Sequence, residues 1–173
     1  MDMNYCMQCG TKLRMKYHLA PDGEDAGMVP YCDTCESFRS PVFNTAVSKI
    51  VLNETKDKIL LIKPPKGEGY VFVAGYVMQG EEAEETVRRE VSEEVGLRVT
   101  AAQFRHSRYY PRTNTLMLNF TAVVPEAAPH PNHEMKEARW FTPEEAKEHI
   151  RRGSLAEAFL LGYLNDGKYV FPF

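Results

Sequence analysis

Residues 75–97 constrain the fold of this 173-residue chain more than any other stretch. Residues 82–95 contain neither Gly nor Pro, so nothing in them interrupts a helix. Val87, Val91 and Val95 recur at intervals of four, which places one apolar stripe along that helix. The glycine that follows is a candidate C-terminal cap. The stretch therefore predicts a glycine-bearing turn and an amphipathic helix packed on a core.

Negative charge is crowded onto the same helix. Seven glutamates fall between Glu81 and Glu94, against two arginines. Glu90, Glu93 and Glu94 stand at i, i+3 and i+4 and share one face, where like charges destabilise an isolated helix. Either this face is solvated, or a cation balances it. The glutamates flank the valine stripe and follow the 74–75 turn, where a carbonyl can approach, and this favours a hard-oxygen site for Mg²⁺ or Mn²⁺.

The spacing of these residues resembles the Nudix box, G-x5-E-x7-R-E-U-x-E-E-x-G-U, in which U is a bulky aliphatic residue. All nine specified positions match, and they are Gly75, Glu81, Arg89, Glu90, Val91, Glu93, Glu94, Gly96 and Leu97. The resemblance implies an α/β/α sandwich with a mixed sheet. It also implies a Nudix hydrolase, which uses divalent metal to cleave a nucleoside diphosphate linked to another moiety.

The expected metal ligands lie one helical turn apart. Glu90 and Glu94 are expected to bind Mg²⁺ or Mn²⁺, together with the backbone carbonyl of Ala74. Glu93 is expected either to be a second ligand or to hold metal-bound water. The metal would lower the pKa of a bound water and neutralise charge that develops on phosphate.

Three further charged residues belong to the expected catalytic set. Arg89 is expected to pair with Glu81 and so to fix the box, rather than to contact substrate. The sequence EMKEARWF, which starts at Glu134, resembles the E-x-x-E-A-x-W-[FY] motif of the NADH pyrophosphatase branch of proteins with this box. Glu134 is therefore expected to be an additional metal ligand or the catalytic base, whereas Trp140 is expected to pack in the core.

The rest of the chain predicts an α/β architecture. Apolar or alternating runs predict strands at residues 45–52, 58–63, 70–73, 97–106, 116–124 and 138–141. An aromatic, proline-bearing loop is expected between the fourth and fifth of these runs. Thr142 and Ser154 are each followed three residues later by Glu, which predicts two helix starts. Strands mixed with helices indicate a sandwich.

All four cysteines lie near the N-terminus, in two C-x-x-C pairs formed by Cys6, Cys9, Cys32 and Cys35. This spacing suits one tetrahedral Zn²⁺ held by two knuckles with a hairpin between them. A pair of disulfides is the alternative. We expect a structural zinc ribbon at residues 1–38, followed by a Nudix domain at 39–173, because so short a segment cannot build a sufficient core alone.

The cellular setting follows from what the chain lacks. Its N-terminus has no basic start and no apolar block, so it does not resemble a signal peptide, and no apolar run reaches the length of a membrane span. These features indicate a cytoplasmic protein with reduced thiols. A net charge of −3 argues against nonspecific affinity for nucleic acid.

A zinc ribbon before a Nudix domain resembles the NADH pyrophosphatase branch, which includes NAD⁺ diphosphatases and NAD-cap decapping enzymes. The hallmark of that branch, S-Q-P-W-P-F-P-x-S-L-M, aligns with residues 107–117. Ser107, Pro111, Leu116 and Met117 agree, Tyr110 and Thr115 are conservative replacements, and Arg108, Tyr109, Arg112 and Thr113 depart. The resemblance implies substrate contacts from Ser107, Arg108, Tyr109, Tyr110, Arg112 and Thr115, and a backbone contact from Ala156. The two arginines would suit a more anionic substrate, such as one with an extra phosphate.

Three functions are compatible with these patterns. The first is cleavage of NADH or NAD⁺ to AMP and nicotinamide mononucleotide. The second keeps the chemistry but acts on ADP-ribose, a nucleotide sugar, FAD or an NAD-capped RNA end. The third is an inactive zinc-ribbon and Nudix module that binds and regulates, which the complete box disfavours. The resemblance also implies a homodimer.

Overall fold

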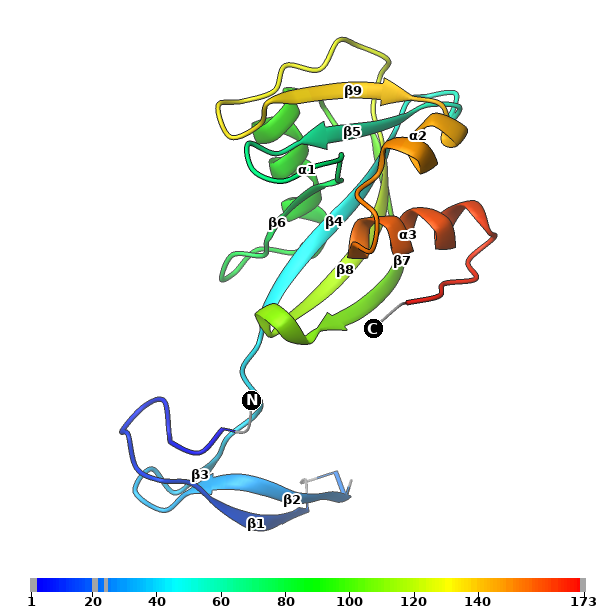
Figure 1. The fold of residues 1–173 in the computed structure, drawn as a ribbon. Helices are drawn as coiled ribbons and strands as arrows, with labels where there is room; N and C mark the ends of the chain where they lie inside the picture. Colours follow the sequence, from blue (N-terminus) through cyan, green and yellow to red (C-terminus); the bar gives the residue numbers. More distant parts are fainter. Residues whose placement is uncertain (1–2, 20–21, 24, 172–173) are drawn as a thin grey trace. The chain divides into compact units, whose positions relative to one another are not determined.

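The computed structural model describes residues 3–19, 22–23 and 25–171. The chain forms two compact units, Met1–Phe43 and Asn44–Phe173, so the division falls slightly after the boundary expected at residue 38. Each unit has its own sheet (Figure 1).

The first unit is a three-stranded antiparallel sheet. Its strands are β1 (Arg14–Leu19), β2 (Asp25–Cys32) and β3 (Ser37–Phe38), in the order β1-β2-β3. The segment between β1 and β2 includes residues 20–21 and 24, which lie outside the described part of the chain. Among the described residues of this unit, only Cys6 and Cys32 are buried. With so little apolar core, the fold needs the cysteine cluster to hold it.

The second unit contains a six-stranded mixed sheet in the order β7-β8-β4-β5-β9, with β6 paired to β4 beside this path. The strands are β4 (Asn44–Leu52), β5 (Ile59–Lys63), β6 (Val73–Tyr76), β7 (Ala101–Tyr110), β8 (Thr115–Val123) and β9 (Glu137–Phe141). β4 and β8 run parallel along their whole length, while the other pairs are antiparallel. On its other side β4 contacts β5 only at its end, which leaves room for the short strand β6.

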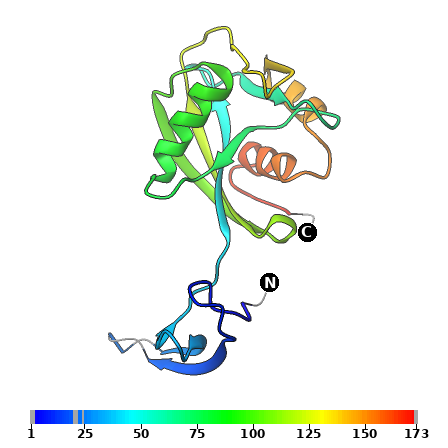
Figure 2. The ribbon, with the colours of Figure 1, turned by 90° about the vertical axis from the view of Figure 1, so that its left-hand side faces the viewer.

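Helices cover both faces of this sheet. α1 (Ala83–Val95) lies on one face, and α2 (Pro143–His149) and α3 (Leu155–Leu164) lie on the other (Figures 1 and 2). The expected α/β/α sandwich with a mixed sheet is confirmed. No helix in the described part of the chain is both long and apolar enough to cross a membrane.

Alternation along the central strand divides the interior into two cores. Val47 and Val51 of β4 pack toward α1, where they meet its valine stripe. Ile50 and Leu52 pack toward α2 and α3. Successive side chains of a strand point to opposite faces, so an apolar run such as 45–52 serves both cores at once.

The helix ends follow the sequence signals. Glu82 and Glu85 form a capping box at the start of α1, and the chain leaves α1 through Gly96 at φ 69°. Thr142 accepts a hydrogen bond from the Glu145 amide at the start of α2, as expected. Ser154 caps α3 in the same way.

The expected aromatic loop is wrong in one respect, because most of it is strand. β7 continues to Tyr110 in register with β8, and only a short 3₁₀ turn, η1 (Pro111–Thr113), separates the two strands. Proline has no N–H for the ladder, so the strand ends where Pro111 begins. β7 also starts later than expected, at Ala101 instead of residue 97.

Candidate active site and metal centre

The turn before α1 is tied to the helix by one arginine. Nε and Nη2 of Arg89 donate to the two carboxylate oxygens of Glu81, over 2.7 Å and 2.9 Å. Nη2 also donates to the carbonyl of Tyr76, at 3.2 Å. The Arg89 guanidinium and the amide of Met78 lower the pKa of Glu81 to about 2. The expected pair is present, and its bidentate geometry fixes the turn against the helix.

Arg89 also contacts two of the expected metal-site glutamates. Its Nη1 donates to Oε1 of Glu90 at 2.7 Å and to Oε2 of Glu93 at 3.1 Å. The Glu93 side chain is mostly exposed, whereas that of Glu90 is largely covered. One guanidinium thus holds Glu90 and Glu93 together on this face of α1.

The carboxylate of Glu90 lies directly against Gly75 of β6. A methyl group at position 75 would overlap the carboxylate carbon and both carboxylate oxygens of Glu90. The backbone at this glycine has an ordinary extended conformation, so the requirement is for space and not for an unusual φ. The glycine of the box motif is therefore needed for close approach of Glu90 to the strand.

Glu94 is the most buried acidic side chain of α1. It is 6% exposed, and its Oε2 has no hydrogen-bond partner among the described residues. The pKa of Glu94 is raised to about 7, chiefly by burial, with Lys49 lowering it and the carboxylates of Glu90 and Glu134 adding to the increase. A buried carboxylate oxygen without a donor fits a cation. The acidic residues present are therefore suited to Mg²⁺ or Mn²⁺.

The loop after β8 carries Glu134 toward this site. The amide of His130 donates to the carbonyl of Val95 and that of Asn132 to the carbonyl of Glu94, at 2.9 Å and 3.0 Å. These bonds fasten the loop to the C-terminal end of α1. The Glu134 side chain is exposed, and its charge reaches Glu94. Across the described residues, however, only the cysteines bring three or more ligand atoms within 4.8 Å of one another.

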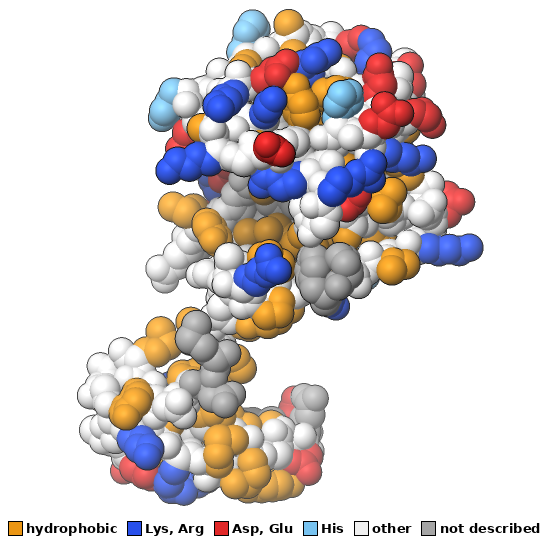
Figure 3. Space-filling view, viewed as in Figure 1, with side chains coloured by type: hydrophobic (Ala, Val, Ile, Leu, Met, Phe, Trp, Pro, Cys, Tyr) orange, Lys and Arg blue, Asp and Glu red, His pale blue; other side chains and the backbone are white. Residues whose placement is uncertain are grey.

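A cavity of about 640 Å³ opens on the opposite face of β6. Ala46 and Met117 lie at neighbouring positions of β4 and β8 and form part of its lining. It reaches Ala74 and Gly75, and so touches the strand against which Glu90 lies. The other lining residues are Val71, Tyr76, Tyr110, Arg112, Thr113, Thr115, Arg151, Arg152, Gly153, Ser154, Leu155 and Ala156. Lys and Arg side chains gather on this face of the unit, the one that carries α2 and α3 (Figure 3).

Four of the seven expected substrate residues line this cavity: Tyr110, Arg112, Thr115 and Ala156. The other three do not. Arg108 lies over the ring of Phe171, 4.9 Å from its centroid. Ser107 and Tyr109 alternate with Arg108 and Tyr110 along β7, so they point to the other face of the sheet. The hydroxyl of Tyr109 donates to Oδ1 of Asn114 at 2.6 Å.

Three residues that the sequence did not single out also line the cavity. Tyr76 pairs with Ala46 across β6 and β4, which places a second tyrosine in a lining that already holds Tyr110. Arg151 donates to the carbonyl of Glu68 at 2.8 Å and Arg152 pairs with Glu157 at 2.9 Å. Tyr76 directly follows the box glycine, but only the strand register shows which face it takes.

Lys49 is a further buried residue close to the acidic face of α1 that no sequence motif includes. It is fully buried on β4, on the face that packs against α1. Burial lowers the pKa of Lys49 to about 8, and the charges of Glu94 and Glu90 oppose that shift. The signal available in the sequence was a single cation inside the apolar run 45–52.

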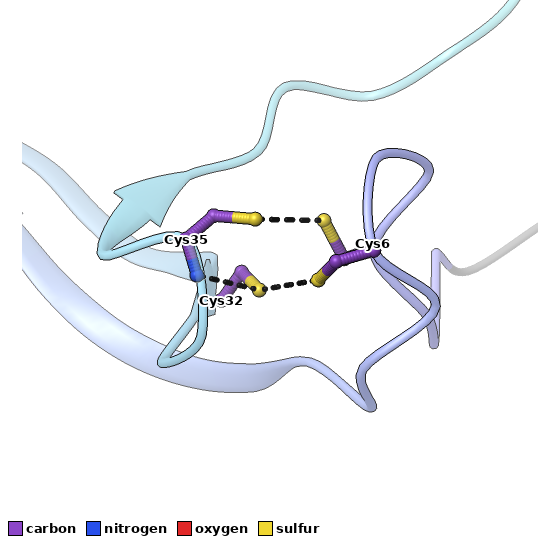
Figure 4. Close-up of side chains that lie close together, drawn as sticks. Cys6, Cys32 and Cys35 are labelled. Atoms are coloured by element: carbon purple, nitrogen blue, oxygen red, sulfur yellow. Dashed lines mark hydrogen bonds between the residues drawn. The ribbon is translucent and has the colours of Figure 1, made fainter.

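The four cysteines of the first unit meet at one point. Sγ of Cys6 is 3.9 Å from that of Cys35, and Sγ of Cys9 is 3.4 Å from that of Cys32 (Figure 4). All four sulfurs lie within 4.8 Å of one another. Four thiolates around a tetrahedral zinc stand about 3.8 Å apart, given Zn–S bonds of about 2.3 Å. The donor set therefore fits one Zn²⁺, and the cysteines are free rather than paired in disulfides.

Arg39 supports this cluster from outside. Its Nε donates to Sγ of Cys6 at 3.2 Å, and its Nη2 donates to Gln8 at 3.1 Å. The Arg39 hydrogen bond lowers the pKa of Cys6 to about 6, against the effect of burial. A cysteine that ionises readily is the form that binds a metal.

Comparison with protein families identifies the family of most of the chain. A family model described as the NUDIX domain matches residues 42–159. The NAD-capped RNA hydrolase NudC of Stutzerimonas stutzeri is 34% identical over 164 residues, which cover 92% of this chain and 55% of that protein. The NAD-capped RNA hydrolase NudC of Deinococcus radiodurans is 35% identical over 143 residues, covering 80% of this chain and 48% of the relative. The chain thus spans about half the length of these curated relatives.

Solved structures share the fold at lower identity. A NUDIX hydrolase from Nitrosomonas europaea superposes with a TM-score of 0.56 at 21% identity, covering 98% of this chain and 96% of that one. The NUDIX domain of Shewanella oneidensis NrtR, solved with ADP ribose, gives a TM-score of 0.57 at 13% identity, with 80% and 90% coverage.

Proposed function

Because the chain belongs to the Nudix hydrolase family, we propose that it hydrolyses the pyrophosphate bond of a dinucleotide, with NADH or NAD⁺ cleaved to AMP and nicotinamide mononucleotide. The observation that carries this proposal is the cavity beside β6. One face of the 74–75 segment lines that cavity, and Glu90 lies on the other face. A base held in the cavity brings the attached pyrophosphate to the acidic residues of α1. The two relatives named NAD-capped RNA hydrolase support a substrate of the NAD type.

The acidic residues divide into ligands and supports. Glu90 and Glu94 would hold a divalent cation with the carbonyl of Ala74, while Glu93 and Glu134 would add a ligand or orient water. A bound Mg²⁺ or Mn²⁺ supplies Lewis acidity, which neutralises phosphate charge and makes water a better nucleophile. Attack of water on one phosphorus would release the other phosphate with the bridging oxygen, and a carboxylate of the site, such as that of Glu134, would take the proton of the water.

Arg89 positions the acidic residues and takes no direct part in the reaction. Arg89 donates hydrogen bonds to Glu81, Glu90 and the carbonyl of Tyr76. This network sets the position of the glutamate ligands relative to β6. Because Arg89 is already saturated by acidic and carbonyl partners, we assign it no contact with substrate.

The cavity provides the recognition groups. Tyr76 and Tyr110 offer rings for stacking on a base, and Thr115 and the backbone at Ala156 offer polar contacts. Arg112 offers a guanidinium for phosphate. Ser107, Arg108 and Tyr109 remain candidates only for substrate parts that extend beyond the cavity, since none of them lines it.

A more anionic dinucleotide is the second candidate substrate. Arg112 and Arg152 present two guanidinium groups to one cavity, and Arg152 needs only to give up an exposed pair with Glu157. An additional phosphate on the bound half, or the chain of an NAD-capped RNA, would satisfy both. ADP-ribose, FAD and nucleotide sugars lack such a group in that position.

We also propose a structural metal in the first unit and a dimeric assembly. One structural Zn²⁺ staples the first unit, and its thiolates suit the reducing cytoplasm. The family resemblance is the support for a homodimer. An inactive regulatory module is the least favoured reading, since every acidic position of the box is filled.

The test is cleavage of a panel of substrates in the presence of Mg²⁺ or Mn²⁺, followed as AMP release from NADH, NAD⁺, ADP-ribose and FAD and as release of the nicotinamide mononucleotide half from NADPH and NAD-capped RNA. The panel contains NADH, NAD⁺, NADPH, ADP-ribose, FAD and an NAD-capped RNA, with Glu94→Gln as the inactive control. We expect the highest kcat/KM on an NAD-type substrate and loss of turnover in the control. Equal or better rates on ADP-ribose would overturn the substrate, and turnover that survives Glu94→Gln would overturn the metal assignment.

A further inference from the structure

One buried cation has no role in the function proposed above. Lys49 is completely buried in the central strand β4, and its Nζ has no hydrogen-bond partner among the described residues. Lysine usually reaches solvent by extending its flexible side chain, so a fully enclosed ammonium group is exceptional. An enclosed charge is retained only where another charge compensates it.

The immediate walls around Lys49 do not provide that compensation. Lys49 pairs in register with Val73 of β6 and Phe120 of β8, and both belong to the apolar core under α1. Val47 and Val51, two positions away on the same strand, face the same core. No polar group at these positions of the sheet therefore compensates the charge of the Lys49 ammonium group.

The compensating charges come from the acidic helix and the turn before it. Lys49 pairs with Val73 of β6, and Gly75, two residues further on the same face of β6, lies against the carboxylate of Glu90, so Lys49 and Glu90 share one side of the sheet. The charges of Glu94 and Glu90 act on Lys49, Glu81 acts more weakly in the same sense, and Arg89 opposes them. Glu94 is itself buried, and its Oε2 also has no donor among the described residues. Lys49 takes part in none of the ion pairs within 4.0 Å found in the described part of the chain. Two opposite charges are thus enclosed together without direct contact.

We propose that Lys49 is the internal counter-charge of the divalent-metal site. It stabilises the carboxylates of Glu94 and Glu90 in the position from which they bind metal, and it weakens metal binding by offsetting part of their negative potential. The effect is large because the charges interact in a water-poor interior. Lys49 is a positioning residue that acts through the two glutamates, so the inference rests on their proposed role as ligands.

Two consequences follow for the site. Without metal, the acidic cluster keeps a cation beneath it, so α1 can stay packed on the sheet. With metal, the ion and Lys49 share the same carboxylates, so the ion is held less tightly than the glutamates alone would hold it. Exchange of metal and release of the phosphate products both benefit from looser binding.

The first test is Mn²⁺ binding to zinc-loaded full-length protein, measured by calorimetry without substrate. Lys49→Met keeps the length of the side chain and removes its charge, and we expect it to lower the Kd for Mn²⁺ about tenfold. Arg88→Met is the matched control, because it removes the same charge from an exposed position on α1. Solvent screens that charge, so the control should change the Kd less than about twofold. A Kd for Lys49→Met that matches the control would overturn the proposal.

The second test covers the case in which Lys49→Met folds poorly. Removing Lys49 alone leaves Glu94 buried without compensation, which destabilises the metal-free protein. The double variant Lys49→Met with Glu94→Gln removes both charges, so its Tm should exceed that of Lys49→Met. If the double variant melts no higher than the single one, Lys49 and Glu94 are not coupled and the proposal fails.

These readouts separate the inference from the function on which it rests. Mn²⁺ affinity and melting report on Lys49 without any turnover. A protein that binds Mn²⁺ more tightly as Lys49→Met but releases no AMP from any substrate would keep the counter-charge and lose the proposed reaction. Normal AMP release by Lys49→Met together with an unchanged affinity for Mn²⁺ would keep the proposed reaction and overturn the counter-charge role of Lys49.

Discussion

Among single residues, Gly75 has the most direct geometric consequence, because the carboxylate of Glu90 occupies the space of its missing side chain. We expect Gly75→Ala to displace Glu90 and to lower kcat/KM about 100-fold, since a shift of about 1 Å at a reacting centre has an effect of that order. The backbone conformation at Gly75 suits alanine, so Tm should change little.

Steady-state AMP release and a thermal melt of Gly75→Ala check this together. Ser92→Ala, on the exposed side of α1, is the control and should retain both activity and Tm. Activity near that of the wild type in Gly75→Ala would show that Glu90 does not need its place against β6.

Glu81 gives a prediction about pH. In the folded protein its pKa is lowered from 4.5 to about 2, chiefly by Arg89. A lowered carboxyl pKa contributes stability that is fully present above the unfolded value and is lost as pH falls through the folded value. Glu81→Gln should therefore melt below the wild type near neutral pH, and the difference should shrink between pH 4.5 and about 2. Melting both proteins across this range is the measurement, and a constant difference would contradict the prediction.

Residues on one helix were more predictable than residues on strands. Arg89 and Glu81 lie close in the chain, so their pairing follows from the spacing of a turn and a helix. Lys49 and Tyr76 depend on which face a strand turns toward α1, and that is decided by pairing with segments far away in sequence. Their positions could not be read from local pattern.

At the scale of elements, the exit from α1 depends on Gly96. This residue has φ 69° and ψ 18°, a left-handed conformation that costs other residues about 1–2 kcal/mol. An added methyl group would also lie 3.3 Å from Cβ of His130. We expect Gly96→Ala to lower the free energy of unfolding by about 1–2 kcal/mol, as measured by denaturant titration. A free energy of unfolding equal to that of the wild type would show that the turn after α1 accepts alanine without strain.

Element identity was largely predictable, but element partners were not. The strands expected at 45–52 and 58–63 and the helix starts at Thr142 and Ser154 are all present. The parallel pairing of β4 with β8 joins segments whose register no local signal specifies. The extension of β7 to Tyr110 was also missed, because proline and asparagine nearby suggested a loop.

For the whole molecule, the zinc cluster and the active site belong to separate compact units. Cys9→Ser removes one of four ligands, so the bound zinc should fall below one equivalent per chain. The first unit has almost no buried apolar core, and we expect it to lose protection from proteolysis in residues 1–43. AMP release by the second unit should persist. Zinc analysis, limited proteolysis and the activity assay test this on the full chain, and intact protection without zinc would contradict the role of the metal as a staple.

The two-unit organisation was accessible from composition alone, since all the cysteines fall in the first 35 residues. The cavity was not. Its lining comes from β4, β6, the turn between β7 and β8, and the segment that enters α3, which are distant in sequence. Only the family resemblance pointed to some of its residues, and three of the seven that it named lie elsewhere.

The two faces of strand β6 have different roles, one in binding and the other in bond cleavage. Ala74 faces the cavity and Gly75 admits Glu90, so binding and bond cleavage meet at adjacent residues but use different side chains. Part of the cavity wall is built from turns, at residues 111–113 and 151–154, and turns tolerate exchange better than a packed helix does. Substitutions at residues 110–115 and 151–156 are therefore expected to change the substrate specificity, while the glutamates of α1 that serve hydrolysis stay the same.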